Sequence, residues 1–300
     1  MVNSRKVFIL RELRQITVIG LGLLGGSIGL SVLRALGDVK VVGYSHRPST
    51  RQKARQLAVA TEIADNLRQS VANADMVILA TPICAFEQIL ADIAQSLPTG
   101  CIVTDVGSTK VLPHKWAKKI LPKGVYYVGS HPIAGSEQRG VEFSRDDLFE
   151  RAKCVITDTA GTDAESKKIV ADFWKRLGCS IIELTPAEHD KIFARVSHLP
   201  HLTAASLINA NDIETLKFSG KGMIDTTRIA SGPENVWSDI VMTNSANLVK
   251  GIEKIIGELE RVKKAIEKED KKSVEEFLAK ARSKREDMMN YKIENKELES

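Results

Sequence analysis

The fold is decided by the stretch Ile16-Thr17-Val18-Ile19-Gly20-Leu21-Gly22-Leu23-Leu24-Gly25-Gly26. A β-branched run, typical of a strand, leads directly into a glycine-rich turn and then into a helix-like segment over residues 27–36. At such a junction, backbone N–H groups and the positive end of the helix dipole are free to bind a pyrophosphate. The stretch therefore predicts a dinucleotide-binding site.

Each glycine of this turn has its own expected role. Gly20 permits the tight turn, Gly22 allows the backbone to approach the phosphates, and Gly25 allows the helix to lie close to the strand. The expected cofactor contacts, at this turn and after the predicted strand 76–80, are Gly20, Gly22, Leu23, Leu24, Gly25, Thr81 and Pro82.

Length and charge narrow the class of protein. A chain of 300 residues suits two domains of ordinary size. The net charge of +5 is spread over 43 basic and 38 acidic residues, so the chain lacks the concentrated basic surface of a nucleic-acid-binding protein. We therefore expect a small anionic ligand and no nucleic acid.

Cysteine usage and hydropathy indicate the compartment. The chain has four cysteines, Cys84, Cys101, Cys154 and Cys179, which lie far apart and form no CxxC pair. The apolar run at residues 7–10 is too short for a signal sequence, and no later segment resembles a membrane span. The sequence therefore predicts a cytoplasmic protein that does not enter a membrane.

β-Branched runs alternate with helix-like segments in the first part of the chain. Continuous apolar strands between helices indicate a mostly parallel sheet covered on both faces, a doubly wound Rossmann-like α/β fold. The expected strands lie at residues 16–19, 39–44, 76–80, 101–105, 125–128, 154–157 and 179–184. We assign residues 1–184 to a dinucleotide-binding domain.

From Thr185 onward the sequence has helical periodicity and few strand signals. Thr185, Pro186 and Glu188 form the pattern of a capped first turn, which opens a long helix that Pro200 should bend. Residues 250–300 carry an apolar helical stripe with charged flanks. We expect residues 185–300 to form an all-α substrate and dimerisation domain that pairs into a homodimer, the alternative being a helix that closes its own domain.

The residues about twenty positions beyond the glycine turn usually select the nicotinamide cofactor, because an acid there binds the 2′-hydroxyl of NAD. This chain has Ser45, His46 and Arg47 at that point and no carboxylate. A hydroxyl and a guanidinium suit a 2′-phosphate, so we expect NADP to be preferred. NAD is the alternative if Arg47 is a solvated loop charge.

Four polar segments follow the glycine turn along the chain, at residues 105–110, 131–137, 197–201 and 225–230. From the glycine turn to about Met242, their order and spacing resemble the prephenate/arogenate dehydrogenase family. The resemblance implies an active site between a Rossmann-like domain and a helical dimerisation domain. It also implies oxidative decarboxylation of prephenate to 4-hydroxyphenylpyruvate, or of arogenate to tyrosine.

His131 has the chemistry of a general base for this reaction. Its imidazole, at the end of a predicted strand and fixed by Pro132, has an unperturbed pKa of about 6.5 and can accept a hydroxyl proton at neutral pH. Positive charge on the oxidised cofactor and on Arg228 should keep it neutral. By resemblance, Ser108 hydrogen-bonds the same hydroxyl and helps to hold His131.

A dicarboxylate substrate needs cationic partners, and the planar guanidinium of Arg228 can bind a carboxylate through two hydrogen bonds. His198 and His201 are three residues apart, so they share one helical face. The resemblance implies that His201 contacts the substrate, that His198 supports the cleft, and that Glu137 is a gating residue able to pair with Arg228. Buried polar packing of the histidines and a first-turn acid at Glu137 are the structural alternatives.

The substrate and the function class leave alternatives open. We favour prephenate, because its keto-acid side chain has no amine that would need an anionic partner, and arogenate is the second choice. Another Rossmann reductase, such as a pyrroline-5-carboxylate reductase or a β-hydroxyacid dehydrogenase, fits less well. A non-enzymatic NADP(H) sensor would need the glycine turn without the polar segments. We expect no metal, since the candidate ligands all fall in one helix: His189, Asp190, His198 and His201.

Overall fold

The computed structural model describes residues 13–135 and 138–295. The chain divides into two compact units, of which the first ends at Asn247 and the second begins at Leu248. Both sheets and every described candidate site residue belong to the first unit. Within the described ranges, no helix combines the length and the apolar character needed to cross a bilayer.

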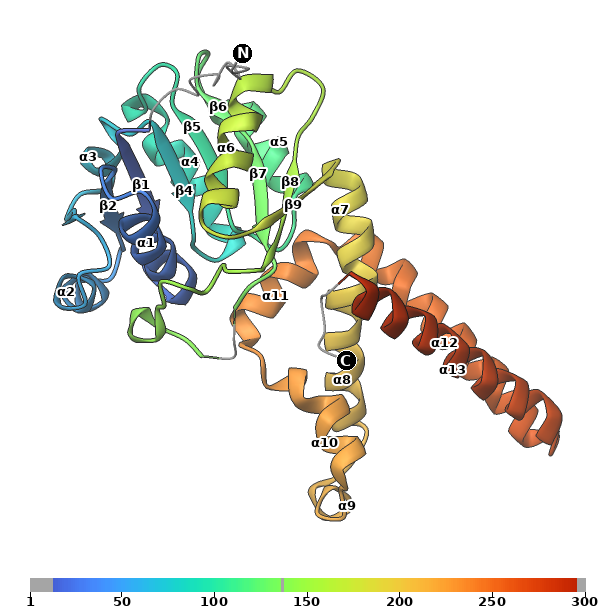
Figure 1. Ribbon diagram of the computed structural model, residues 1–300. Helices are drawn as coiled ribbons and strands as arrows, with labels where there is room; N and C mark the ends of the chain where they lie inside the picture. The colour runs from blue at the N-terminus through green and yellow to red at the C-terminus, as the bar shows by residue number, and fades with distance from the viewer. Residues whose placement is uncertain (1–12, 136–137, 296–300) are drawn as a thin grey trace, which may run out of the picture. The chain divides into compact units, whose positions relative to one another are not determined.

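A six-stranded sheet forms the centre of the first unit, in the order β3-β2-β1-β4-β5-β6, and every neighbouring pair is parallel (Figure 1). Its strands are β1 (Gln15–Ile19), β2 (Lys40–Tyr44), β3 (Glu62–Ile63), β4 (Met76–Leu79), β5 (Ile102–Asp105) and β6 (Tyr126–Tyr127). Its helices are α1 (Leu23–Ala35), α2 (Pro48–Gln56), α3 (Leu67–Val71), α4 (Phe86–Ile93) and α5 (Val111–Ile120). The strand order reverses between β1 and β4, which is where a doubly wound sheet binds its ligand.

The central strands feed two apolar clusters, one on each face of the sheet. On one face, Ile16 and Val18 of β1 pack in a cluster with Ile28 of α1. On the other face, Ile19 packs in a cluster with Phe86 of α4. Strands that are buried on both faces carry continuous apolar runs, so the predicted parallel sheet with helices on both sides is confirmed.

A second sheet of three strands lies beside the first, with β7 (Gly129–Pro132), β8 (Lys153–Thr157) and β9 (Ser180–Leu184) in sequence order and α6 (Ala164–Arg176) packed on it. The runs at 154–157 and 179–184 are strands, as predicted, but they do not extend the parallel sheet, because β7 separates them from it and is antiparallel to β8. The hydroxyls of Thr104 on β5 and Ser130 on β7 are 2.9 Å apart and join the two sheets.

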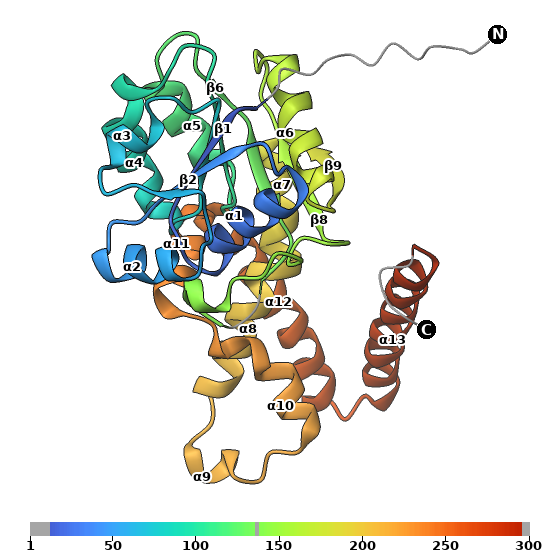
Figure 2. The ribbon, with the colours of Figure 1, turned by 60° about the vertical axis from the view of Figure 1, so that its left-hand side comes forward.

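The remainder of the first unit is helical and projects away from the sheets before α11 returns toward them (Figure 2). Its helices are α7 (Pro186–Phe193), α8 (Leu199–Asn209), α9 (Ile213–Leu216), α10 (Lys221–Thr227) and α11 (Glu234–Thr243). The predicted cap is confirmed, because Thr185 Oγ1 accepts the Glu188 N–H at 3.3 Å and the Glu188 carboxylate accepts the Thr185 N–H at 2.9 Å. The expected long helix is interrupted by the π-helical segment Ala194–His198, just before the turn that holds Pro200. Such π-helical turns are frequent at functional sites.

The second unit consists of most of α12 (Ser245–Glu267) together with α13 (Lys271–Glu294). Asp270 caps α13, since its carboxylate accepts the Ser273 N–H at 3.0 Å. The predicted apolar stripe lies on α12, and several of its side chains are more than a third exposed, namely Ile252, Ile256, Leu259 and Ile266. The second unit alone therefore leaves an apolar helix face in contact with water.

Candidate active site

The glycine turn after β1 has the geometry that a dinucleotide requires. Gly20 has a φ of +102°, which side chains rarely adopt, and a Cβ at Gly25 would lie 1.8 Å from the Gly20 carbonyl oxygen. A Cβ at Gly22 would meet no atom within 4 Å. Gly20 and Gly25 are therefore required by the fold, whereas Gly22 borders open space that a ligand can occupy.

Polar groups around this space lack partners. Helix α1 starts at Leu23 without a side-chain cap and without an acidic residue in its first turn, so its first N–H groups are available to an anion. After β4, the buried Oγ1 of Thr81 has no hydrogen-bond partner among the residues described. Both observations fit a nicotinamide dinucleotide held by the glycine turn, by Leu24, and by Thr81 with Pro82.

The end of β2 presents arginines and a buried serine. Ser45 is buried, whereas His46 and Arg47 are exposed. Arg51 of α2, which the sequence analysis did not single out, donates to the Ser45 carbonyl at 2.7 Å and pairs with Asp65 at 2.9 Å. Arg47 and Arg51 therefore place two guanidinium groups at the edge where a nucleotide ribose is recognised.

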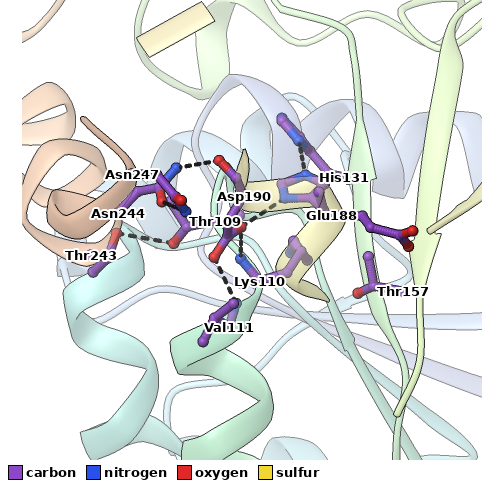
Figure 3. Close-up of polar contacts among 12 residues, drawn as sticks. Thr109, Lys110, Val111, His131, Thr157, Glu188, Asp190, Thr243, Asn244 and Asn247 are labelled. Atoms are coloured by element: carbon purple, nitrogen blue, oxygen red, sulfur yellow. Dashed lines mark hydrogen bonds and ion pairs between the residues drawn. The ribbon is translucent and has the colours of Figure 1, made fainter. Parts of the chain in front are cut away.

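His131 belongs to a hydrogen-bonded chain of three side chains. Its Nδ1 lies 2.9 Å from Nε2 of His189, and Nδ1 of His189 lies 2.8 Å from Oδ1 of Asp190. Figure 3 shows His131 and Asp190 at the two ends of this chain. The His189 ring stacks on Phe193 with 4.5 Å between centroids, and Phe193 also lies 4.9 Å from the His131 ring. The three rings therefore restrict one another.

Asp190 ties this chain to the start of α5. Its two carboxylate oxygens accept the backbone N–H groups of Lys110 at 2.7 Å and Val111 at 2.9 Å (Figure 3). Its backbone carbonyl accepts a hydrogen bond from Nδ2 of Asn244 at 2.8 Å, and the same Nδ2 lies 3.2 Å from Nδ1 of His198. Asp190 therefore links α7 both to the loop after β5 and to the end of α11.

A buried ion pair between Asp105 and Lys110 holds the loop after β5. Both side chains are fully buried. Asp105 also accepts the Tyr127 hydroxyl at 2.9 Å and the Ser130 N–H at 3.1 Å, and Lys110 Nζ donates to the Ser130 carbonyl at 2.7 Å. Because Ser130 precedes His131 in β7, this network fixes the position of the His131 backbone.

Burial keeps the imidazoles of this region neutral. It lowers the pKa of His189 to about 2 and that of His198 to about 4. The pKa of His131 is also held well below its ordinary value of 6.5, first by burial and then by His189, Lys110 and His198. A neutral His131 imidazole is ready to accept a proton at neutral pH. The expected neutral state is supported, although burial and not neighbouring positive charge is its main cause.

A second group of rings lies on α8 and α11. His201 is buried and stacks on Trp237, with 3.5 Å between ring centroids and 11° between planes. A Cβ at Gly232 would lie 2.3 Å from Nε1 of Trp237, so the stack requires that glycine. Nδ1 of His201 and Nε2 of His198 are buried without a hydrogen-bond partner in the described part of the chain. These two nitrogens are suited to polar groups of a ligand.

The other predicted residues are less closely tied to His131. Arg228 is exposed at the start of the 3-10 turn Arg228–Ser231, which packs on α8, the helix of His201. Ser108 is partly exposed in the loop between β5 and α5. Glu137 lies outside the described residues. The contacts of Ser108 and Arg228 with a substrate stay predictions.

Sequence reasoning missed several members of this network. The sequence analysis considered His189 and Asp190 only as weak candidates for metal ligands. It did not consider Trp237, Asn244 or Arg51. The adjacent His-Asp pair directly after a capped helix start was an available signal. No sequence signal marks Asn244, because its role depends on its contacts with Asp190 and His198, which are distant in the chain.

Models of two domain families match the chain. The nucleotide-binding domain of prephenate dehydrogenase matches residues 28–183, and the dimerization domain of prephenate dehydrogenase matches residues 185–280. The two matches together include His131, His189 and His201, whereas the glycine turn lies just before the first of them.

Individual relatives match over similar lengths. The prephenate dehydrogenase of Bacillus subtilis is 31% identical over 278 residues, which cover 90% of this chain and 75% of that protein. The crystal structure of the A. aeolicus prephenate dehydrogenase in complex with hydroxyphenyl propionate and NAD+ has a TM-score of 0.86 at 32% identity, and the match covers 92% of this chain and 99% of that one. The Synechocystis arogenate dehydrogenase has a TM-score of 0.79 at 28% identity, covering 91% and 99%.

Proposed function

The chain belongs to the prephenate dehydrogenase family, and from this we propose that it converts prephenate to 4-hydroxyphenylpyruvate and carbon dioxide, with hydride transfer to a nicotinamide dinucleotide, in tyrosine biosynthesis. The observation that carries the proposal is the 2.9 Å contact between Nδ1 of His131 and Nε2 of His189, which holds the His131 imidazole on β7, where burial lowers its pKa and favours the neutral ring. Membership of an enzyme family also favours catalysis over a non-enzymatic NADP(H) sensor.

His131 is the proposed general base. The ring hydroxyl must lose its proton as the carbon that bears it becomes a ketone-like centre, and the imidazole of His131 accepts that proton. The nicotinamide ring, when bound, supplies the hydride acceptor. Carbon dioxide leaves from the opposite ring carbon, and the electron pair of the broken bond completes the aromatic ring as a phenolate. The phenolate oxygen takes a proton back from His131 to give the phenol of 4-hydroxyphenylpyruvate, and aromatisation provides the driving force. Ser108 donates a hydrogen bond to the same hydroxyl in this proposal and so orients it toward His131.

Cationic and imidazole groups of the helical part are proposed to hold the acid end of the substrate. Arg228 binds a carboxylate through its planar guanidinium. His201 contacts the substrate, and its buried, unpartnered Nδ1 supports this role. His198 supports the cleft, and Glu137 acts as a gate that pairs with Arg228.

We propose that NADP is preferred over NAD. The support is the buried hydroxyl of Ser45 with Arg47 and Arg51 beside it, at an edge where a carboxylate would select NAD. Ser45→Asp should raise the ratio of kcat/KM for NAD to that for NADP by about tenfold or more. A matched Ser45→Ala variant controls for loss of the hydroxyl, and an unchanged ratio in Ser45→Asp would remove the assignment.

Prephenate is proposed as the substrate, with arogenate as the alternative. Relatives of both kinds are similar to this chain, so the choice rests on the keto-acid side chain of prephenate, which has no amine that would need an anionic partner, and on the unpartnered Nδ1 of His201, which can serve a carboxylate. Steady-state kinetics with both substrates and both cofactors tests the proposal. A higher kcat/KM for arogenate would reverse the choice.

The working form is proposed to be a homodimer through the helical domain, with the functional boundary between residues 184 and 185. The match to a dimerization domain and the exposed apolar side chains of α12 support this. Light scattering coupled to size exclusion should give twice the 33.0 kDa chain mass. A cytoplasmic location stays a prediction from the cysteine pattern.

A further inference from the structure

We propose that His189, anchored by Asp190, is a positioning residue that fixes the tautomer of His131. The basic nitrogen is then Nε2 of His131. This inference rests on the proposed role of His131 as general base, and it adds which atom receives the proton and what prepares that atom.

The order of donors and acceptors follows from Asp190. Both of its carboxylate oxygens already accept backbone N–H groups, from Lys110 and Val111, so the carboxylate is an acceptor. The ring nitrogen 2.8 Å from Oδ1 must therefore donate, which puts the proton of neutral His189 on Nδ1. Its Nε2 then carries a lone pair.

The same reasoning carries one step further to His131. Nε2 of His189 can only accept, so the 2.9 Å contact requires that His131 donate from Nδ1. Neutral His131 then has its lone pair on Nε2. A base needs this nitrogen free, and the opposite tautomer would present an N–H to a substrate hydroxyl and could not take its proton.

The surroundings favour this arrangement over others. The titratable groups that act on the two rings are Lys110 at the end of the loop after β5, Asp190 beside His189 on α7, His198 of the π-helical segment and His114 of α5. Among them Asp190 is the acceptor, and both imidazoles are kept neutral by burial. When His131 gains a proton, its Nδ1–H stays bonded through His189 to the carboxylate, which stabilises the imidazolium.

Packing alone offers a competing account, because the His189 ring stacks on Phe193. Two substitutions separate the accounts. His189→Phe keeps a ring against Phe193 but offers no acceptor to His131. His189→Gln loses the ring but can place an amide oxygen where Nε2 was. The tautomer account predicts that the glutamine variant is the more active, and the packing account predicts the reverse.

The first test is steady-state turnover of prephenate. In His189→Phe, kcat should fall about 100-fold or more with KM changed less than about threefold, and in His189→Gln it should stay within about tenfold of the unmodified enzyme. His114→Phe is the matched control, since it also removes a buried imidazole and one hydrogen bond, that to Thr157 at 2.9 Å, but does not touch His131. Its kcat should stay within about threefold of the unmodified enzyme. Equal or higher activity of His189→Phe than of His189→Gln would overturn the proposal.

The second test needs no substitution and no catalysis. In ¹⁵N-histidine-labelled enzyme at neutral pH, the two ring nitrogens of a neutral imidazole give distinct shifts, so the spectrum reports which one carries the proton. His131 should be protonated on Nδ1, and protonation on Nε2 would overturn the inference. Full turnover by His131→Asn would contradict the role of His131 as general base without changing the ¹⁵N spectrum of the unmodified enzyme, so failure of the proposed function and failure of this inference are distinguishable.

Discussion

Acid should destabilise the first unit through its buried histidines. Burial lowers the pKa of His114 and of His198 from 6.5 to about 4, and that of His189 to about 2. Below pH 6.5 the unfolded chain therefore binds more protons than the native one. The contribution of these histidines to the free energy of unfolding is fully present above pH 6.5 and is lost as the pH falls toward their folded-state pKa values.

The size of the effect follows from the same values. One pH unit below 6.5, each imidazole that stays neutral only in the native state lowers the free energy of unfolding by about 1.4 kcal/mol. Three of them give about 4 kcal/mol. Burial raises the pKa of Asp190, which acts in the opposite direction, whereas the lowered pKa values of His131 and His201 add to the loss, so this figure counts the three histidines alone.

The difference in free energy of unfolding between about pH 7.5 and about pH 5.5 can be measured by urea unfolding, followed by circular dichroism at a fixed protein concentration. His114→Phe should shrink the difference by about a third, whereas substitution of the exposed His46 by Gln should leave it unchanged. A free energy of unfolding that differs by less than about 1 kcal/mol between the two conditions would show that these histidines do not stay neutral in the native protein as described.

Three other outcomes test the binding groups. Gly22→Ala should fold normally, because the new Cβ meets nothing within 4 Å, but calorimetric titrations should show cofactor affinity weakened by about tenfold or more. In Gly25→Ala the new Cβ would lie 1.8 Å from a carbonyl oxygen, so this variant should lose several kcal/mol of stability. Equal stability of the two glycine variants would contradict the geometry. Arg228→Lys should raise the KM for prephenate by about tenfold or more with little change in kcat, and an unchanged KM would remove Arg228 from the substrate site. Tyrosine, if it inhibits, should compete with prephenate, since it shares the ring and acid groups; purely non-competitive inhibition would place its site elsewhere.

The main sheet was predictable because its strands are covered on both faces. Burial on two sides leaves unbroken apolar runs, and the glycine turn marks the first βα junction. The cap at Thr185 was predictable for the same kind of reason, since a capping box is a local device with a fixed spacing.

Strand β7 was not predictable from its own residues. Gly129, Ser130, His131 and Pro132 have no strand pattern, and Pro132 argues against one. The segment is extended because it pairs with β8 and because Asp105 and Lys110 bind the backbone groups of Ser130, so its conformation depends on residues far away in the chain.

The same limit applies to the candidate site. The residue types at His131, His198 and His201 were visible in the sequence, but the partner of His131 was not. His131 and His189 are 58 positions apart and meet only because α7 crosses the loop after β5. Gly26 is a similar case, since the reason for it is Ser144, whose Oγ would lie 2.0 Å from an added Cβ.

Turnover by His131→Asn, with cofactor affinity measured on the same preparation, decides whether His131 is the general base. We expect kcat to fall by about 10²- to 10⁴-fold while the Kd for the nicotinamide dinucleotide stays within about twofold, because the imidazole takes the proton and the glycine turn holds the cofactor. Turnover within about tenfold of the unmodified enzyme, with cofactor bound normally, would contradict this role of His131.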